Sequence, residues 1–307
     1  MGTASKGKQD GTRRQKIAAQ RAAARRAQVR KRLFLAAGSI VAVAAVVIAL
    51  AVVKAGSAPG TAAAASEGPT GAALHSLVAD VTSVPASVLD TVGGGDLAAD
   101  GMTKVNGTPL TSGGKPELLY IGADFCPYCA AERWAMIIAL SRFGTFSGLS
   151  TIHSSTTDVD PDTPTFTFYG SSYTSKYLSF VSVEETTNYR QGNSASTSVP
   201  YVTLQTPTAA EQSLLNTYDP GSDGSPIPFI DIGNKYVEIS NLAPYGPQDL
   251  AGLTWSQIAT ALRDPATAIA QGADASANYL TAGICEMTGN QPASACTSAV
   301  RALEPKL

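Results

Sequence analysis

Residues that commonly bind metals are scarce in this sequence, which has two histidines and four cysteines among its 307 residues. His75 and His153 do not show the spacing of a ligand pair, and zinc sites normally use two closely spaced pairs of ligands. The cysteines form one close pair and one looser pair, Cys126 with Cys129 and Cys285 with Cys296. The sequence contains no internal repeat and no glycine-rich phosphate-binding loop. We therefore expect neither a metal nor a cofactor.

Positive charge is concentrated at one end of the chain. Residues 1–32 carry 11 of the 22 Lys and Arg residues and a single acid, Asp10. The remaining residues hold 11 basic and 23 acidic side chains, so the body of the protein is acidic although the whole chain has a net charge of only −2. A basic tail on an acidic body does not indicate a nucleic-acid-binding fold, and we expect no nucleic acid partner.

An uncharged apolar run, residues 33–53, follows the basic tail directly. As a helix it would span about 30 Å, the thickness of the hydrocarbon core of a bilayer. Basic residues at 30–32 precede it, and after Lys54 none follows until Lys104, so the positive-inside rule predicts a cytoplasmic N-terminus and an extracytoplasmic body. A cleaved signal peptide is the alternative, but its apolar region would be unusually long. Both interpretations, the uncleaved anchor and the cleaved signal peptide, place the body of the protein in an oxidising compartment.

A short apolar run leads into the closer cysteine pair. Residues 118–121 are Leu-Leu-Tyr-Ile and predict a buried strand, whereas residues 130–140 are rich in helix formers and lack Gly and Pro. The sequence Cys-Pro-Tyr-Cys at 126–129 therefore lies where a strand passes into the first turn of a helix. The free amides and the dipole of a helix start stabilise a thiolate, so we expect a low pKa for an exposed Cys126. Cys129 follows on the same helical face, within reach of the Cys126 sulfur.

This placement predicts dithiol–disulfide exchange, in which Cys126 attacks a substrate and Cys129 resolves the mixed disulfide. Two simpler interpretations stay open, namely half of a zinc site and an inert structural disulfide. The zinc interpretation lacks a second ligand pair of the usual spacing elsewhere in the chain.

The remaining segments predict an alternation of strands and helices around this centre. Residues 54–72, rich in Ala, Gly and Pro, are expected to form a flexible linker. Residues 73–115 form a lead-in, whose apolar residues recur at helical spacing from 73 to 90 with Pro85 as an interruption. Further strands are predicted at 149–155, 165–169 and 177–183, and a further helix at 254–263.

Two later stretches carry clear local signals. The segment 208–218 is predicted to be a helix because Thr208 is a possible cap and Glu211 stands at capping-box spacing. Residues 224–239 contain two apolar runs separated by Gly-Asn, which predicts a β-hairpin. The Ile227–Pro228 bond directly before this hairpin is a position where a cis peptide bond would be used.

The order of strand, Cys-x-x-Cys helix, strand, insert, helix, proline-led hairpin and helix resembles the thioredoxin fold over residues 116–264. The resemblance implies an α/β fold with a mixed central sheet flanked by helices, and it places Cys126, Cys129 and Pro228 at the redox pair and the cis-proline. Residues 122–134 with 142–144 also resemble the membrane-associated thioredoxin-like proteins grouped as domain-of-unknown-function family 929. That second resemblance runs over most of residues 74–307.

The sequence departs from the thioredoxin pattern near the cysteines. Tyr120 stands where cytosolic thioredoxins have a buried acid, so the proton acceptor for Cys129 is left unassigned. Residues 127–128 are Pro-Tyr, the glutaredoxin pair, although no glutathione site is otherwise recognisable. Asp124 could replace the missing acid, but we interpret it as a solvated loop carboxylate.

Several other polar residues near these segments are interpreted as structural. We expect Glu132 and Arg133 on the surface of the helix and Trp134 as an anchor in the core. His153, near the end of a predicted strand, is interpreted as a structural histidine rather than a base.

The C-terminal residues 265–307 are expected to form a helical extension beyond this fold. Cys285 and Cys296 enclose a turn between two short predicted helices. In an oxidising compartment we favour a structural disulfide between them, worth slightly under about 3 kcal/mol. A second redox pair that relays electrons to the Cys126–Cys129 pair is the alternative.

Together these features predict a single-pass membrane protein with an extracytoplasmic thiol–disulfide oxidoreductase domain. Its partners would be protein thiols and disulfides, with a membrane redox partner as a further expectation. Two other functions stay open: a non-catalytic binding module built on the thioredoxin fold, and a dithiol that reduces an apo-protein during metal or haem delivery.

Overall fold

The computed structural model describes residues 68–97, 102–219, 227–241 and 244–307. The predicted basic tail (1–32), the predicted transmembrane helix (33–53) and residues 54–67 of the predicted linker lie outside the described residues. Within the described part of the chain, no single helix has the length and apolar character needed to cross a membrane. Helices α2 (Gly71–Thr82) and α3 (Ala86–Val92) meet that test only together, as a pair bent by 52°.

A six-stranded mixed sheet forms the centre of the described fold. Its strands are β1 (Met102–Lys104), β12 (Tyr236–Ile239), β11 (Phe229–Ile232), β3 (Lys115–Gly122) and β2 (Thr111–Ser112) in that order, with β8 (Ser179–Glu184) also paired to β3. The β3–β8 pair is parallel, and the other neighbours are antiparallel. Tyr120 of β3 lies between Ile230 of β11 and Ser182 of β8. The predicted buried strand is thus the middle of the sheet, where both faces are covered.

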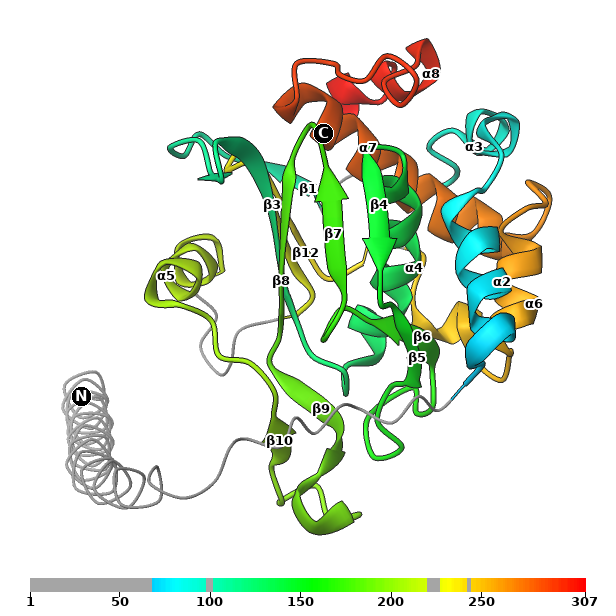
Figure 1. Ribbon diagram of the computed structural model, residues 1–307, viewed down its shortest axis with the longest axis vertical. Helices are drawn as coiled ribbons and strands as arrows, with labels where there is room; N and C mark the ends of the chain where they lie inside the picture. Colours follow the sequence, from blue (N-terminus) through cyan, green and yellow to red (C-terminus); the bar gives the residue numbers. More distant parts are fainter. Residues whose placement is uncertain (1–67, 98–101, 220–226, 242–243) are drawn as a thin grey trace, which may run out of the picture. The chain divides into compact units, whose positions relative to one another are not determined.

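Helices cover both faces of this sheet (Figure 1). One face packs against α4 (Pro127–Ser141) and the helices around it, and the other packs against α5 (Ala209–Tyr218). Alternate residues of β3 divide between the two cores, Leu118 and Tyr120 facing α4 and Leu119 and Ile121 facing α5. The protein is therefore a mixed α/β structure with a central sheet flanked by helices.

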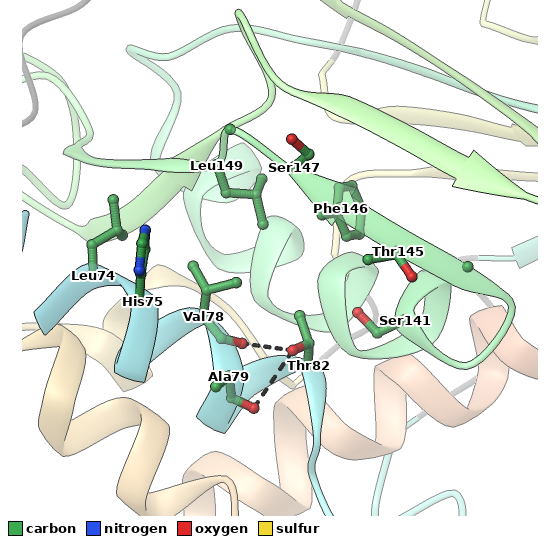
Figure 2. Close-up of a pocket in the computed structure, with 12 residues that line it drawn as sticks. Leu74, His75, Val78, Ala79, Thr82, Ser141, Thr145, Phe146, Ser147 and Leu149 are labelled. Carbon is green, nitrogen blue, oxygen red and sulfur yellow. Dashed lines mark hydrogen bonds between the residues drawn. The ribbon is translucent and has the colours of Figure 1, made fainter. Parts of the chain in front are cut away.

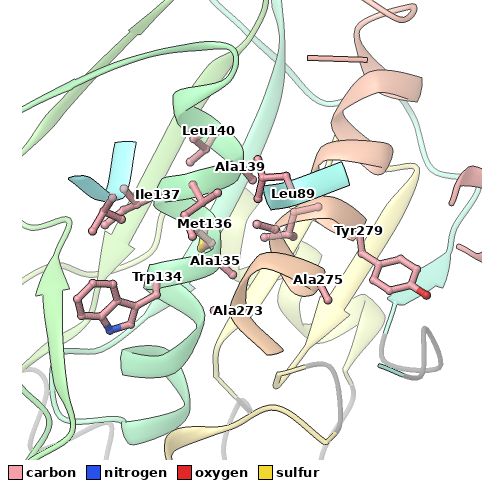
Figure 3. Close-up of a cluster of buried hydrophobic side chains, with 14 of the residues drawn as sticks. Leu89, Trp134, Ala135, Met136, Ile137, Ala139, Leu140, Ala273, Ala275 and Tyr279 are labelled. Carbon is pink, nitrogen blue, oxygen red and sulfur yellow. The ribbon is translucent and has the colours of Figure 1, made fainter. Parts of the chain in front are cut away.

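The helices on the α4 side come from distant parts of the chain. They are α2, α3, α6 (Trp255–Ala261), the π-helical turn η4 (Ala270–Asp274) and α7 (Ala275–Met287). Figure 3 shows Trp134, Met136 and Ile137 of α4 in the same apolar cluster as Ala275 and Tyr279 of α7. We expected only short helices beyond the main fold after residue 265, but α7 has 13 residues and lies within the main core. The core thus extends almost to the C-terminus.

Three separate antiparallel strand pairs lie outside the central sheet. They are β4 (Gly144–Ser147) with β7 (Ser172–Ser175), β5 (Ser150–His153) with β6 (Pro164–Thr167), and β9 (Thr186–Arg190) with β10 (Tyr201–Thr203). Short helical turns complete the described part: η2 (Gln191–Asn193), η3 (Pro247–Leu250), α8 (Ser298–Arg301) and η5 (Glu304–Lys306). The strands β4, β7, β9 and β10 were not predicted, because three to five residues without sustained alternation give no clear signal.

The strongest local signals are confirmed. Thr208 and Glu211 form a reciprocal capping box at the start of α5. The hairpin β11–β12 turns at Gly233 and Asn234, which both have positive φ (67° and 57°), as a tight hairpin turn requires. Pro85 separates α2 from α3, as the interruption at this position predicted.

Candidate functional site

The closer cysteine pair lies where β3 passes into α4. Cys126 is the N-cap of α4 and has an extended backbone, and Pro127 is the first helical residue, where a missing N–H costs nothing. The Cys126 Sγ accepts a hydrogen bond from the backbone N–H of Cys129 at 3.2 Å. The sulfur therefore accepts a hydrogen bond from one of the first-turn backbone N–H groups, which have no hydrogen-bond partner within the helix.

Both cysteines are free thiols, and both are buried. The Cys126 side chain is 5% exposed, whereas that of Cys129 is fully buried. We expected an exposed Cys126 sulfur, but the residue is almost fully buried, and the Ile227 carbonyl lies against the sulfur. Of the two cysteines, Cys126 is therefore the nearer to solvent.

Pro228 is brought to the cysteine pair by strand β11. The Ile227–Pro228 peptide bond is cis, as predicted, and Pro228 is buried. The Cys126 thiol lies 3.6 Å from the backbone carbonyl of Ile227, to which it donates a hydrogen bond. Three predicted site residues that are up to a hundred positions apart thus meet at one end of the sheet.

The environment separates the acid strengths of the two thiols. Burial is the largest influence on the Cys126 thiol and by itself would raise its pKa. The pKa of Cys126 is nevertheless lowered below its usual value. Hydrogen bonds from the Cys129 thiol and from the backbone N–H groups of Cys129 and Tyr128 lower it, and so does the charge of Arg133. Burial raises the pKa of Cys129 well above the usual value, and the hydrogen bond to Cys126 adds to this rise. The structure therefore holds one thiol prone to ionise and one that keeps its proton.

A buried charge network lies directly behind the pair. The Arg133 guanidinium donates through Nε and Nη2 to the two carboxylate oxygens of Glu184, at 2.9 and 2.6 Å. Nη2 also donates to the Ala123 carbonyl at 2.8 Å and lies 3.6 Å from Asp124 Oδ1. All three charged side chains are fully buried. The predictions that Asp124 is solvated and that Arg133 lies on the helix surface are therefore wrong, because the insert and β8 cover them.

Tyr120 occupies the position that lacks an acid. It lies on β3 under α4, and its hydroxyl is buried without a hydrogen-bond partner. Burial raises the pKa of Tyr120 well above its usual value, so the phenol is neutral and is no proton acceptor for Cys129.

A second group of buried acids surrounds the next turn of α4. Glu132 accepts hydrogen bonds from Asn241 at 2.8 Å and from Ser276 at 3.3 Å, and burial raises its pKa to about 8. Burial and the proximity of Glu132 raise the pKa of Glu238 well above its usual range. Burial also raises the pKa of Asp274 to about 8. The prediction that Glu132 lies on the surface is wrong, because the chain around η4 and α7 covers this side of the helix.

The insert between β8 and α5 holds the loop that precedes Cys126. The ring of Phe125 stacks on the ring of Tyr201 of β10, with ring centroids 4.3 Å apart. The Arg190 guanidinium carbon lies 4.0 Å from the centroid of the same Tyr201 ring. The backbone of Phe125 accepts a hydrogen bond from the N–H of Ser155 at 2.9 Å, and the N–H of Asp124 donates to the Thr186 carbonyl at 2.9 Å. The insert and the loop after β5 therefore both hold the segment that leads to Cys126.

A small polar cavity lies next to this loop, and Ser155, which bonds the Phe125 backbone, is part of its lining. A cavity of about 220 Å³ lies between residues 154–157 and 188–195 and is lined mainly by hydroxyl, amide and guanidinium groups. Among the described residues, the exposed large apolar side chains are Tyr128 (39%), Tyr189 (36%) and Val159 (61%). Tyr128 stands between the cysteines, and the other two belong to segments adjoining this cavity.

A larger cavity of about 680 Å³ lies at the opposite end of α4 (Figure 2). It is bounded by α2 and by residues 141–149, and its labelled lining includes Leu74, Val78 and Phe146. His75 also lines it, but no predicted site residue does. His153, at the end of β5, packs against the Trp255 ring with centroids 4.5 Å apart, which is a structural position.

The second cysteine pair forms a disulfide. Cys285, on α7, is bonded to Cys296, and both are buried. Arg142, at the C-terminal end of α4, donates a hydrogen bond to the carbonyl of Ala295 at 3.0 Å. The disulfide therefore lies near the end of α4 that is remote from Cys126.

Among the described residues, no group of three or more His, Cys, Asp or Glu side chains has the geometry to hold a metal ion.

The fold and the site together define a mixed α/β protein with a reduced Cys-x-x-Cys pair at the start of a helix, next to a cis-proline. The chain belongs to the family described as domain of unknown function (DUF929), whose model matches residues 101–286. Comparisons with curated proteins and with solved structures gave no match.

Proposed function

We propose that this protein is a membrane-anchored, extracytoplasmic thiol–disulfide oxidoreductase with a thioredoxin-like fold. The observation that carries the proposal is the asymmetry of the cysteine pair. Cys126 caps α4, keeps a small exposed fraction and has a lowered pKa, while Cys129 is fully buried and has a raised pKa. An attacking thiol and a resolving thiol require this division of properties.

The chain order supports a thioredoxin-like fold. β3 leads into α4, β8 returns parallel to β3, and the insert and α5 then lead to the proline-preceded hairpin β11–β12, which is antiparallel to β3. The order differs from the predicted one in one strand: the strand predicted at 149–155 is β5, which pairs with β6 outside the central sheet, and β8 takes the place parallel to β3. Pro228 is assigned to bind the backbone of the substrate, because its cis bond presents the Ile227 carbonyl to the Cys126 sulfur.

The exchange proceeds in two steps in the reductive direction. The Cys126 thiolate attacks one sulfur of a substrate disulfide, a Cys126–substrate bond forms, and the other substrate sulfur leaves as a thiolate that takes a proton from water. Cys129 then attacks the Cys126 sulfur, and its proton passes to the departing substrate sulfur, which leaves as a thiol. The Cys126–Cys129 bond forms, and the second substrate sulfur leaves. Two electrons pass from the dithiol to the substrate, and the reverse sequence oxidises it.

Two features support the proposed location. The uncharged run at 33–53 follows a basic tail, which favours an anchor with the body outside the cytoplasm. The Cys285–Cys296 disulfide is of the kind that persists in an oxidising compartment.

Turnover by the full chain in detergent tests the proposal. With dithiothreitol as the electron donor, the wild-type protein should accelerate reduction of insulin disulfides, and Cys126→Ser should remove the acceleration. A wild-type rate equal to that of Cys126→Ser contradicts the proposal, as does one bound zinc per reduced protein. Capture of polypeptides without turnover would instead favour a binding module, and selective reduction of an apo-metalloprotein or a haem-binding peptide would favour a delivery role.

A further inference from the structure

Arg133 is a cation without access to water, placed one helical turn beyond Cys129. Its guanidinium forms a two-point ion pair with Glu184 of β8, which the register sets opposite Gly122 of β3. Its Nη1 is buried without a hydrogen-bond partner. A buried ion pair of this kind rarely adds net stability, because both groups lose their hydration. Stability of the fold alone therefore does not explain why an ion pair is buried at this position.

The guanidinium is connected to the cysteine pair through one backbone unit. The carbonyl of Ala123 accepts a hydrogen bond from Arg133 Nη2 at 2.8 Å. The backbone N–H of the same residue hydrogen-bonds the Cys129 sulfur and lowers its pKa, against the larger effect of burial. The Tyr120 ring lies between the sheet and the helix, 5.9 Å from the guanidinium carbon. The Arg133–Glu184 ion pair and the sulfurs of Cys126 and Cys129 thus lie in one buried region of low dielectric constant.

We propose that Arg133 and Glu184 tune the reactivity of Cys126 by opposing effects, the guanidinium stabilising the Cys126 thiolate and the carboxylate limiting that stabilisation. The two residues are positioning residues, since they act on the sulfur through space and touch no substrate. The inference rests on the proposed function for its biological meaning. Its test does not, because alkylation of a thiolate requires no turnover.

The two charges have opposing effects at one neighbouring group, Tyr120, which lies on β3 beside the ion pair. Burial is the largest influence on the pKa of Cys126, and Arg133 is among the groups that lower that pKa. At Tyr120, burial raises the pKa, Arg133 lowers it and Glu184 raises it. Asp124 is the further charged group in this region. Because water is excluded here, each charge acts on the sulfur with little screening.

The experiment is the pH dependence of iodoacetamide alkylation of the reduced full chain, with modification at Cys126 followed by mass spectrometry. In this reaction the Cys126 thiolate displaces iodide and forms a thioether. At the midpoint pH of the wild-type profile, Arg133→Met should lower the rate about fivefold. Glu184→Gln should move the midpoint to lower pH and raise the rate at that pH, to at most about twice, because half of the thiol is already ionised there.

Two further variants keep the test decisive. Arg133→Met with Glu184→Gln removes both charges without leaving one buried and unpaired, so it should fold and give a midpoint between those of the single variants. Arg142→Met removes a partly buried cation at the other end of the same helix and should leave the midpoint unchanged. Shifts of the same sign in Arg133→Met and Glu184→Gln, or no shift in Glu184→Gln and the double variant, overturn the proposal.

The outcome is separable from that of the proposed function. Opposite shifts in a protein that reduces no insulin support the tuning and contradict the oxidoreductase. Unchanged midpoints in a protein that turns over contradict the tuning alone.

Discussion

Cys126 and Cys129 belong to one turn of helix, but their surroundings give the two thiols different burial and different pKa shifts. Cys126 receives backbone N–H groups and a carbonyl contact at the edge of the core, whereas Cys129 lies beneath it without access to solvent. The difference follows from position, because the N-cap has free amides above it and the residue three places later points into the core. This geometry supports the proposed attack by Cys126 and resolution by Cys129.

Glu132 gives a pH-dependent prediction at the scale of a single residue. Its pKa rises from an ordinary 4.5 to about 8 on folding, so the stability it contributes is full below pH 4.5 and is lost as the pH rises toward 8. Glu132→Gln removes this titration while keeping a side chain that can bond Asn241. We expect the variant to be more stable than wild type at pH 8, on the order of 2 kcal/mol, and to gain little at pH 5.

Urea unfolding at both pH values measures this effect. Glu286→Gln, which removes the ion pair with Lys235 on the partly exposed side of α7, serves as the control and should not make the protein more stable at pH 8. An equal loss of stability in Glu132→Gln at pH 5 and pH 8 would show that Glu132 is ionised in the folded protein.

The sequence predicted the chemistry of individual residues only where the reason is local. The helix start at Cys126 and the proline before β11 are local features, and both were predicted. The burial of Asp124, Glu132 and Arg133 depends on β8, the insert and α7, which come from 50 to 150 positions later in the chain. A helix turn that is polar in sequence gives no sign that another element will cover it.

At the scale of elements, α4 separates the two cysteine pairs. Its 15 residues span about 22 Å, with Cys126 at one end and Arg142 at the other. Arg142 binds the carbonyl next to Cys296, so the disulfide belongs to the far end of the helix. Direct exchange between the pairs is excluded in this arrangement, which favours a structural disulfide over an electron relay.

Replacing Cys285 and Cys296 together with Ser tests this assignment. The disulfide closes a loop of about a dozen residues, so its loss should lower the free energy of unfolding by about 3 kcal/mol. Reduction of a small disulfide substrate by the folded variant should continue at nearly the wild-type rate. A well-folded variant that has lost turnover would point to the relay instead.

Elements with strong local signals were predicted, whereas the β9–β10 pair and the packing of the C-terminal helix α7 against α4 were not. The capping box of α5, the Gly-Asn turn of β11–β12 and the break at Pro85 each have a cause within a few residues. The β9–β10 pair instead depends on Phe125 stacking on Tyr201, and α7 depends on the apolar side of α4. The residues within each of these elements do not indicate which distant segment the element will contact.

At the scale of the whole molecule, the charge distribution predicts an orientation in the membrane. Eleven of the 22 basic residues precede the apolar run at 33–53, and the body is acidic. A reporter enzyme fused after Leu307 should therefore be active only if it needs an extracytoplasmic location. Replacing Arg30, Lys31 and Arg32 with Ser should weaken this preference.

Activity of a cytoplasmic reporter at the same position would reverse the assigned orientation. It would also place the cysteine pair in a reducing compartment, where the Cys285–Cys296 disulfide is not expected to persist.

The most direct test of the account is covalent trapping in the full chain. Cys129→Ser leaves Cys126 able to attack but removes the thiol that releases the product, so a mixed disulfide with polypeptide substrates should accumulate through Cys126. The linkage is located by non-reducing electrophoresis and mass spectrometry, and Cys126→Ser with Cys129→Ser should trap nothing. The account predicts adducts on Cys126 only; adducts on the Cys129 of a Cys126→Ser protein, with none on Cys126 in the Cys129→Ser protein, would contradict it.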